Sequence, residues 1–470
     1  MNDWSGQRVL IIGAARQGTA LARYLSACGA QVLLNDHRSA DQLQDVQADL
    51  SDLSIEWVLG GHSPSLLEGI DKVCPSGGVP LTIPLVVEAQ KRGIPLSNDS
   101  QIFLEAAPCK VIGITGSAGK TTTTTLVGRI AEESAKDENH ASSSSNLHTS
   151  GVWVGGNIGN PLISNIDEMT ADDLVVMELS SFQLEIMTRS PQVAAVLNLT
   201  PNHLDRHGTM EAYTAAKARI LDFQREEDTA VLGCDDPGAW GLLDSVQGGL
   251  VSFGSSVPSE GQAGCFLDGD HITLWDGESN HVLFARENIA LRGAHNLANV
   301  LGACAIAHAV GFPDEATRNG VEGFTGVAHR LEFVRSWGGA DWYNDSIATA
   351  PERTIAAVHA FDEPLVLLLG GRDKNLPWRD LAALVCQRVE HTILFGESAG
   401  LIERAIRSQT GNGPCTVAVC QDLAQAVEAA AEVVEPGDVV LLSPGGTSFD
   451  AFRDFAERGE KFRLWVNELL

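Results

Sequence analysis

The residues of this chain best suited to chemistry form a glycine-rich turn that ends in lysine and threonine. The turn reads T-G-S-A-G-K-T over residues 115–121 and follows an apolar run at 110–114. Glycines let backbone N–H groups approach a phosphate, and the start of a following helix adds the positive end of its dipole. Lys120 would reach the terminal phosphates of a nucleotide, and the Thr121 hydroxyl would bind Mg²⁺. A glycine turn without a ligand would not explain the adjacent lysine and threonine.

A carboxylate and an imidazole follow two further apolar strands. Glu178 ends the strand-like run at 174–179, and His203 comes shortly after the run at 193–199. Ligands of open α/β sheets gather at the carboxyl ends of strands, and Mg²⁺ prefers oxygen ligands. We therefore expect Glu178 to hold Mg²⁺ and His203 to bind metal or phosphate. An acid in this position can also cap a helix.

Lys217 lies in a predicted helix that faces the same strand ends. Taken alone, it would be read as an exposed helix lysine. The last third of the chain adds polar turns at successive strand ends, and among their residues Arg330 and Lys374 are candidates to meet the charges of ATP and of a carboxylate substrate. These turns lie at 328–332, 344–349, 370–374 and 443–448.

The composition is that of a globular protein, with 44% hydrophobic and 20% charged residues among 470. The net charge of −29 argues against a binder of nucleic acid or of anionic membranes. Nine cysteines without C-x-x-C spacing fit a reducing cytoplasm. We find no secretory signal and no apolar run of about 18 residues, so we expect a cytoplasmic protein without a membrane span.

Strand-like and helical runs alternate along the chain, which predicts an α/β fold with parallel sheets in three domains. We place the boundaries at 1–99, 100–326 and 327–470, and expect a small antiparallel part within 251–291. The first segment carries the turn G-A-A-R-Q-G at 13–18, in which Ala15 replaces the middle glycine of a dinucleotide fingerprint. This replacement argues against a nicotinamide cofactor and leaves a nucleotide held through its base and sugar.

Together these motifs resemble those of the Mur ligase family, ATP-dependent amide-bond ligases of cell-wall synthesis. The resemblance covers essentially the whole chain, and E-L-S-S-F-Q-L-E at 178–185 is characteristic of the D-glutamate-adding branch. The other motifs that carry it are T-G-S-A-G-K-T, G-G-N-I-G, N-x-x-x-x-H-L-D-R-H, A-K-A-R-I, A-H-R-L-E, N-D-S-I-A-T, G-G-R-D-K and S-P-G-G-T-S-F-D-x-F.

The resemblance implies a role for each domain. It makes 1–99 a Rossmann-like domain for the UDP-linked substrate, 100–326 a P-loop ATPase-like domain for ATP, and 327–470 a Rossmann-like domain for the amino acid that also closes over ATP. Catalytic roles would fall to Lys120, Glu178, His203 and Lys217.

The resemblance also assigns ligands to individual positions. Metal ligands would be Thr121, Glu178, His203 and Lys217, the last as a carbamate, which would turn a cation into a metal-binding anion. ATP would be held by Gly116, Ser117, Ala118, Gly119, Lys120, Thr121, Thr122, Asn296, Arg330 and Asp345. The UDP-linked substrate would contact Ala14, Ala15, Asp36 and Arg38 through its uridine nucleotide and Asn157, Ser180 and Gln183 through its muramoyl part. The amino acid would contact Thr349, Lys374, Ser448 and Phe455.

The implied activity joins D-glutamate to UDP-N-acetylmuramoyl-L-alanine through an acyl phosphate, with ATP and Mg²⁺, in cytoplasmic peptidoglycan precursor synthesis. The resemblance further implies a monomer. Many family members have lysine where Ile347 stands, so a ligase for L-glutamate or another amino acid is an alternative within the same class. A P-loop regulator that hydrolyses ATP as a switch is the alternative from another class, but it would leave the convergence of Glu178, His203 and Lys217 unexplained.

Overall fold

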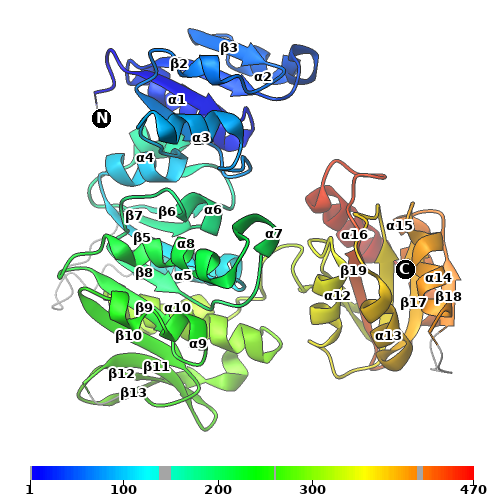
Figure 1. Cartoon of the computed structure of the whole chain (residues 1–470). Helices are drawn as coiled ribbons and strands as arrows, with labels where there is room; N and C mark the ends of the chain where they lie inside the picture. Colours follow the sequence, from blue (N-terminus) through cyan, green and yellow to red (C-terminus); the bar gives the residue numbers. More distant parts are fainter. Residues whose placement is uncertain (1–2, 137–149, 259–260, 410–415) are drawn as a thin grey trace. The chain divides into compact units, whose positions relative to one another are not determined.

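The computed structural model describes residues 3–136, 150–258, 261–409 and 416–470. The chain separates into two compact units (Figure 1). Unit 1 consists of Met1–Ile289 and His295–Gly323, and unit 2 of Ala290–Ala294 and Phe324–Leu470. Both are built mainly from parallel strands connected by helices, so the predicted α/β class is confirmed.

Unit 1 begins with a four-stranded parallel sheet in the order β3-β2-β1-β4. The strands β1 and β2 are buried along almost their whole length, as their continuous apolar runs predict. The strands are β1 (Arg8–Ile12), β2 (Gln31–Asp36), β3 (Ile55–Leu59) and β4 (Lys72–Pro75). The helices are α1 (Arg16–Ala27), α2 (Gln44–Asp49), α3 (Pro84–Lys91) and α4 (Asp99–Ala106).

The second sheet of unit 1 has nine strands in the order β13-β12-β11-β10-β9-β8-β5-β7-β6. Strands β5 to β11 pair in parallel, whereas β12 pairs antiparallel with both β11 and β13, which confirms the predicted antiparallel part. The strands are β5 (Lys110–Thr115), β6 (Val152–Gly156), β7 (Leu174–Glu178), β8 (Val193–Val196), β9 (Thr229–Gly233), β10 (Gly249–Gly254), β11 (Ala263–Asp268), β12 (His271–Trp275) and β13 (Asn280–Ala285). The helices are α5 (Lys120–Lys136), α6 (Ser181–Leu184), α7 (Leu204–His207), α8 (Met210–Asp222), α9 (Pro237–Trp240), α10 (Ala294–Val310) and α11 (Asp314–Val321).

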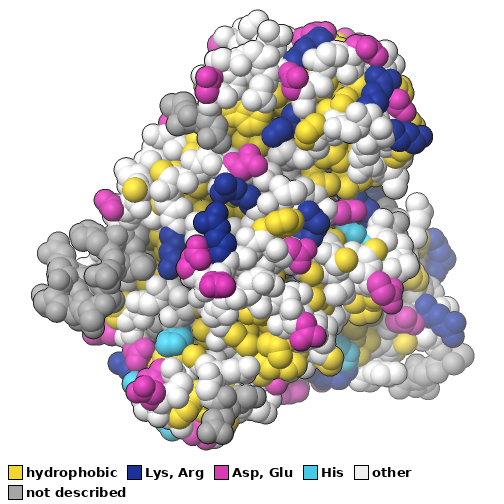
Figure 2. Space-filling view, turned by 60° about the vertical axis from the view of Figure 1, so that its left-hand side comes forward, with side chains coloured by type: hydrophobic (Ala, Val, Ile, Leu, Met, Phe, Trp, Pro, Cys, Tyr) yellow, Lys and Arg dark blue, Asp and Glu magenta, His cyan; other side chains and the backbone are white. Residues whose placement is uncertain are grey.

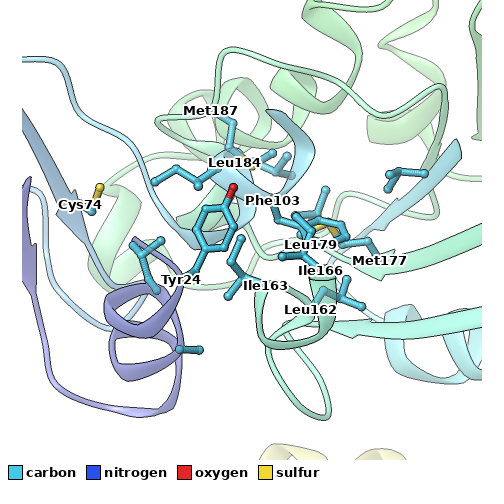
Figure 3. Packing of buried hydrophobic residues seen from close by; sticks show 14 of the residues in the cluster. Tyr24, Cys74, Phe103, Leu162, Ile163, Ile166, Met177, Leu179, Leu184 and Met187 are labelled. Carbon is cyan, nitrogen blue, oxygen red and sulfur yellow. The ribbon is translucent and has the colours of Figure 1, made fainter. Parts of the chain in front are cut away.

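The two sheets of unit 1 share one apolar core. Figure 3 shows Tyr24 of α1 lying near Phe103 of α4 and near Ile163 and Leu184, which belong to the part of the chain that forms the second sheet. Burial of such side chains contributes about 1.5–3 kcal/mol each, which favours a fixed arrangement of the two sheets.

Unit 2 contains a six-stranded sheet in the order β14-β15-β19-β16-β17-β18, parallel except for the β14–β15 hairpin. Helices cover both faces, and two separate apolar clusters fill the layers. The strands are β14 (Glu332–Trp337), β15 (Ala340–Asn344), β16 (Leu365–Gly370), β17 (Val389–Phe395), β18 (Thr416–Val419) and β19 (Val439–Gly445). The helices are α12 (Pro351–Val358), α13 (Arg379–Arg388), α14 (Ala399–Arg407), α15 (Leu423–Val433) and α16 (Phe455–Glu468).

Within the described residues, no helix is long and apolar enough to cross a membrane. On the face of the molecule drawn in Figure 2, basic and acidic side chains are interspersed.

Candidate active site

The phosphate loop has the predicted strand, turn and helix. It joins the end of β5 to the start of α5, and Gly119 adopts a positive φ of 81°. A Cβ atom on Gly119 would lie 2.0 Å from Oδ1 of Asn299, so both the backbone conformation and the space demand glycine. The Lys120 ammonium donates to the carbonyl of Gly116 at 2.9 Å, which folds this side chain over the loop.

Three residues that the sequence analysis gave no role hold the loop in place. Asn198 accepts from the N–H of Ala118 at 2.8 Å and donates to its carbonyl at 3.1 Å. The hydroxyls of Ser117 and Tyr213 lie 2.8 Å apart, and the N–H of Thr200 donates to the Ser117 hydroxyl at 2.9 Å. The contacts that Asn198 and Tyr213 make with the loop span 80 and 96 residues of the chain, so no local sequence pattern reveals these contacts.

Glu178 lies at the end of β7, beside the phosphate loop, and is 1% exposed. Its carboxylate accepts from the Thr121 hydroxyl at 2.8 Å and from the Asn157 amide at 2.8 Å. A Cβ atom on Gly156 would lie 2.4 Å from the carbonyl of Glu178, so the glycine turn after β6 packs directly on this strand end. The structure thus brings Thr121, Asn157 and Glu178 together.

Lys217 of α8 lies close to this group, at the end of β5. The residue is 1% exposed, and its ammonium nitrogen lies 3.0 Å from the Thr115 hydroxyl. Burial lowers the pKa of Lys217 well below its usual value; the nearby charge of Lys120 lowers it further, and Glu178 partly opposes the shift. The surroundings therefore favour the uncharged amine, which is nucleophilic.

His203 lies directly before α7 with a left-handed backbone, at φ 52°. It is exposed, and its ring centroid lies 5.0 Å from that of Phe182. The neighbouring His207 is engaged with the protein, since its Nε2 lies 3.0 Å from the Ser181 hydroxyl and its ring stacks on Phe182. Of the two imidazoles, His203 is the one that faces solvent.

Ser180 and Gln183 form a capping box at the start of α6. The Gln183 carbonyl oxygen accepts from the N–H and the hydroxyl of Ser180, at 2.9 and 2.8 Å, and its amide nitrogen donates to Ser100 at 2.8 Å. Asn98 in turn donates to the backbone carbonyl of Gln183 at 2.8 Å. Gln183 therefore connects the second sheet to the start of α4, in addition to the substrate contact that the resemblance implies.

The predicted uridine residues meet at the carboxyl ends of β1 and β2. Asp36 accepts from the N–H of Ala14 at 2.8 Å and from the Arg38 guanidinium at 2.8 and 3.0 Å. Burial alone would raise the pKa of Asp36, but the hydrogen bonds from Arg38 and Ala14 outweigh it and hold the pKa well below its usual range. Ala15 occupies the N-cap position of α1. A Cβ atom on Gly18 would lie 1.9 Å from the carbonyl of Gly13, which explains the last glycine of this turn.

Asn296 and Asn299 lie one turn apart near the start of α10, and the Asn299 amide donates to the Asn296 carbonyl oxygen at 3.1 Å. Because Asn299 also packs against Gly119, the pair lies beside the phosphate loop. The sequence analysis gave no role to Asn299. Asn299 follows Asn296 by three residues, and this spacing, which puts both side chains on one face of a helix, could have indicated that the two act together.

In unit 2, Asp345 follows β15 and is 5% exposed. Burial raises the pKa of Asp345 to about 7, although a hydrogen bond from Ser443, the Leu331 N–H and the charges of Arg330 and Arg353 act in the opposite direction. The Ser443 hydroxyl lies 2.8 Å from Oδ2 of Asp345. Arg330 and Asp345 are thus close enough for their charges to interact.

The predicted amino-acid residues lie at neighbouring strand ends of unit 2. Lys374 donates to the Thr349 hydroxyl at 3.3 Å. Ser448 is buried after β19, and the carbonyl of Phe455, at the start of α16, accepts from Ser346 at 2.8 Å. The fully buried Arg458, which sequence reasoning missed, donates to Ser346 and to the carbonyl of Gly446.

One expectation about this region is wrong. The pattern of residues from Ser448 through Phe455 to Arg458 predicts a helix that begins at Ser448, but the helix α16 begins seven residues later, at Phe455. The Asp454 side chain accepts from the Glu457 N–H and caps the helix there. Ser448 consequently lies in the turn itself.

Among the residues that the structure describes, no three His, Cys, Asp or Glu side chains come together as a metal site. Thr121 and Glu178 form a pair of oxygen-bearing side chains at the phosphate loop. Such a pair suits Mg²⁺, which binds through one or two protein groups and takes its other ligands from phosphate and water.

Three family descriptions match the chain in succession. Residues 7–98 match the Mur ligase MurD-like N-terminal domain, residues 114–307 the Mur ligase middle domain, and residues 329–446 the Mur ligase glutamate ligase domain. The chain is 40% identical over 465 residues to the UDP-N-acetylmuramoylalanine–D-glutamate ligase of Symbiobacterium thermophilum, covering 98% of each chain. It is 38% identical over 470 residues to the enzyme of the same name from Pelotomaculum thermopropionicum, covering 100% of this chain and 99% of the other.

Solved structures support the fold. UDP-N-acetylmuramate-alanine ligase MurC from Thermotoga maritima matches with a TM-score of 0.56 at 17% identity, over 97% of this chain and 98% of that one. MurF from Acinetobacter baumannii matches with a TM-score of 0.56 at 19% identity, over 100% of this chain and 92% of that one. The three matched domains and the full-length similarity confirm the resemblance read from the motifs: this chain belongs to the Mur ligase family.

Proposed function

We propose that this chain joins D-glutamate to UDP-N-acetylmuramoyl-L-alanine at the expense of ATP, as a cytoplasmic step of peptidoglycan precursor synthesis. Full-length relatives with 34–40% identity carry the corresponding name. The observation within the molecule that carries the proposal is Lys217. Its buried amine lies beside the phosphate loop, where conversion to a carbamate would give an anion that can bind metal. A simple ATP-driven switch does not require such a group.

The chemistry follows from the poor reactivity of a carboxylate as an acyl donor. A carboxylate oxygen of the alanine attacks the γ-phosphorus of ATP, ADP leaves, and an acyl phosphate forms. The amine of D-glutamate then attacks the acyl carbon, phosphate leaves with the bonding electrons, and the amine loses a proton. Lys120 would supply positive charge to the transferring phosphoryl group, and the loop N–H groups would bind its oxygens.

The residues of unit 1 fit a magnesium ion. The Glu178 carboxylate is buried and points, together with the Thr121 hydroxyl, toward the phosphate loop, so both would hold Mg²⁺ through oxygen. Bound Mg²⁺ would neutralise charge on the phosphates. His203, which is exposed beside Phe182, would hold a second ion.

Lys217 would serve as a carbamate. Its uncharged amine can add to carbon dioxide, forming an N–C bond and releasing a proton, and the product is an anion with two oxygen atoms. This anion would lie beside Thr115 and close to Glu178, where it would offset the charge of Lys120 and bind metal. The change of sign explains why a lysine occupies a site that needs carboxylate chemistry.

The remaining residues would hold the two organic substrates. Ala14, Ala15, Asp36 and Arg38 would bind the uridine nucleotide at the first sheet, and Asn157, Ser180 and Gln183 the muramoyl part. Arg330, Asp345 and Asn296 would bind ATP, and Thr349, Lys374, Ser448 and Phe455 the amino acid. In this assignment residues 1–99, 100–326 and 327–470 are the domains for the UDP-linked substrate, ATP and the amino acid, and the chain acts as a monomer.

An isotope experiment tests the acyl phosphate directly. UDP-N-acetylmuramoyl-L-alanine labelled with ¹⁸O in its carboxyl group is incubated with ATP, Mg²⁺, D-glutamate and the protein. The proposal requires one ¹⁸O atom in each released phosphate and a product heavier by one glutamyl residue. Phosphate free of ¹⁸O would exclude the acyl phosphate and favour simple ATP hydrolysis. A labelled phosphate formed with L-glutamate alone would keep the mechanism and favour the alternative specificity that Ile347 raises.

A further inference from the structure

The loop that follows β3 carries a histidine to the carboxyl end of the first sheet. Because β3 pairs in parallel with β2, Gly60 and Gly61 lie beside the end of β2, and both donate N–H groups to the carbonyl of Asp36, at 3.0 and 3.4 Å. His62 comes next and is partly buried. Its Nδ1 lies 2.6 Å from Oδ1 of Asn35, the last residue but one of β2. His62 is therefore held at the sheet edge where the proposed uridine residues meet.

The Asn35 side chain fixes which nitrogen of His62 carries the proton. Asn35 is buried, and its amide nitrogen donates to the carbonyls of Val58 and Gly61, each at 2.7 Å. Because these two carbonyls can only accept, the atom of Asn35 that faces His62 is its oxygen, which can also only accept. Nδ1 of His62 is therefore the donor, and in the neutral ring Nε2 keeps a lone pair. Among the residues that the structure describes, none forms a hydrogen bond with this Nε2.

The surroundings of His62 favour the neutral ring. Burial lowers the pKa of His62 and the nearby His37 lowers it further, while the charge of Asp36 partly opposes the shift. The ring centroids of His37 and His62 lie 6.2 Å apart, and Nδ1 of His37 lies 3.3 Å from Oδ1 of Asp36. Residues 60–65 bring no titratable side chain other than His62 itself. Near neutral pH, His62 thus presents a hydrogen-bond acceptor at the sheet edge.

Asp36, the acid that ends β2, has its acceptor capacity filled by the protein. Its Oδ1 accepts from the backbone N–H and from Nε of Arg38, at 2.9 and 3.0 Å. Its Oδ2 accepts from the N–H of Ala14 and from Nη2 of Arg38, each at 2.8 Å. Two bonds to each oxygen use the lone pairs of the carboxylate. A donor group of a nucleotide bound here therefore needs another acceptor.

The uracil base of the proposed substrate carries the complementary group. Its N3–H can only donate a hydrogen bond, whereas the ribose hydroxyls can donate or accept and the base oxygens O2 and O4 only accept. Cytosine has a bare N3 at the same place, so an acceptor directed there favours uracil over cytosine. A site rejects the wrong base because a buried polar group left unpaired is costly.

We infer that Nε2 of His62 accepts the N3–H of the uracil ring, so that His62 selects a uridine nucleotide over a cytidine nucleotide. The inference rests on the proposed function and adds to it a residue that recognises the base. It also predicts that selectivity depends on pH, because a protonated His62 would present a donor at Nε2 and would no longer accept from N3–H.

The test measures, by calorimetry without ATP, the affinity of the full chain for UDP-N-acetylmuramoyl-L-alanine and for its N3-methyluridine and cytidine counterparts. At pH 8 the wild type should bind the uridine compound about 5- to 150-fold more tightly than either counterpart. His62→Asn is the informative variant, because its amide can keep the bond to Asn35 but places no atom where Nε2 stands. This variant should bind the uridine compound about 2- to 12-fold less tightly and should lose most of the preference.

The pH profile separates recognition of the base from a structural role. As the pH is lowered from 8 to 5, the preference for uridine over cytidine should fall in the wild type and stay constant in His62→Asn. His37→Asn is the matched control, because it removes an exposed neighbouring imidazole and leaves Nε2 of His62 in place. Its preference at pH 8 should stay within about twofold of the wild-type value.

Three results would each overturn the inference. They are a wild-type preference retained in His62→Asn, an equal loss of affinity for all three compounds in that variant, and a wild-type preference that does not change with pH. Failure of the proposed function looks different, since wild-type protein would then bind none of the three compounds.

Discussion

Replacing Lys217 with methionine separates the role of its amine from that of its apolar stem. Methionine keeps a similar length in a site that is 1% exposed, so little space is left empty. Thr115 loses one hydrogen bond with Lys217, worth about 1 kcal/mol, but its hydroxyl still donates to the carbonyl of Leu179 at 2.8 Å. The substitution therefore leaves the buried Thr115 hydroxyl with an acceptor.

The expected change in stability depends on pH. The pKa of Lys217 is lowered in the folded protein, whereas an unfolded lysine titrates near ~10.4. Below that pH the unfolded chain binds a proton that the folded site disfavours, so lysine destabilises the fold by about 1.4 kcal/mol for each pH unit below the unfolded pKa, until the pH reaches the folded pKa. Lys217→Met should therefore be more stable than the wild type at pH 7, and the difference should shrink as the pH approaches 10.

Thermal unfolding at pH 7 and pH 9.5, in buffer free of carbon dioxide and metal, measures this difference. Turnover should meanwhile fall by at least about 10²-fold, since several kcal/mol of charge stabilisation are lost at about 1.4 kcal/mol per factor of ten. Lys110→Met is the control, because Lys110 is only half-buried at the start of β5 and should tolerate the change with activity intact. A Lys217→Met variant that stays active, or whose relative stability does not depend on pH, would refute the role given to this amine.

Three further substitutions test separate parts of the account. Gly119→Ala places a Cβ 2.0 Å from Oδ1 of Asn299 and forces alanine to φ 81°, at a conformational cost of about 1–2 kcal/mol. The affinity for ATP, measured by calorimetry, should therefore fall at least about tenfold. An unchanged affinity would show that the loop rearranges freely. Burial raises the pKa of Asp345 to about 7, so the folded state holds a proton that the unfolded chain releases above about pH 4. Stability from this group is lost as the pH rises from 4 to 7, and Asp345→Asn should gain relative stability over that interval in denaturant titrations; a constant difference would exclude a protonated Asp345. Arg206 donates to the carbonyl of Val79 at 2.7 Å and stacks over Phe182, so it joins the two sheets of unit 1. Arg206→Ala should therefore raise KM for the UDP-linked substrate more than KM for ATP. An equal rise in both KM values would contradict this role.

The sequence predicted those parts of the site that depend on short-range order. The strand, glycine turn and helix around Lys120 lie within one stretch of chain, and their residue types dictate the geometry. The same holds for Glu178 at the end of its strand and for the antiparallel hairpins after β10. Apolar runs identify strands because parallel sheets are buried on both faces.

The contacts that define the chemical state of the site could not be predicted. Lys217 reaches Thr115 across 102 residues, and only the packing of α8 on the sheet shows that the amine is buried. From the sequence alone an exposed helix lysine was the simpler reading. Asn198 and Asn299 were missed for the same reason, since each acts on the phosphate loop from a distant part of the chain.

The start of the last helix illustrates a local error. The run after Ser448 has polar and apolar residues that fit a helix, and the expected helix began there. Asp454 instead caps a helix whose first residue is Phe455, and the preceding turn leaves the carbonyl of Gly446 bound to Arg458. An N-cap residue within a helix-like run therefore predicts where the helix begins better than the run itself does.

The most direct test of the central claim is phosphate release from ATP by the purified protein with UDP-N-acetylmuramoyl-L-alanine and either D-glutamate, L-glutamate or no amino acid. The account predicts sustained release only with D-glutamate, and none when the UDP-linked substrate is left out. Release that depends on L-glutamate would contradict the assigned specificity. Release that depends on neither amino acid nor on the UDP-linked substrate would contradict the ligase itself.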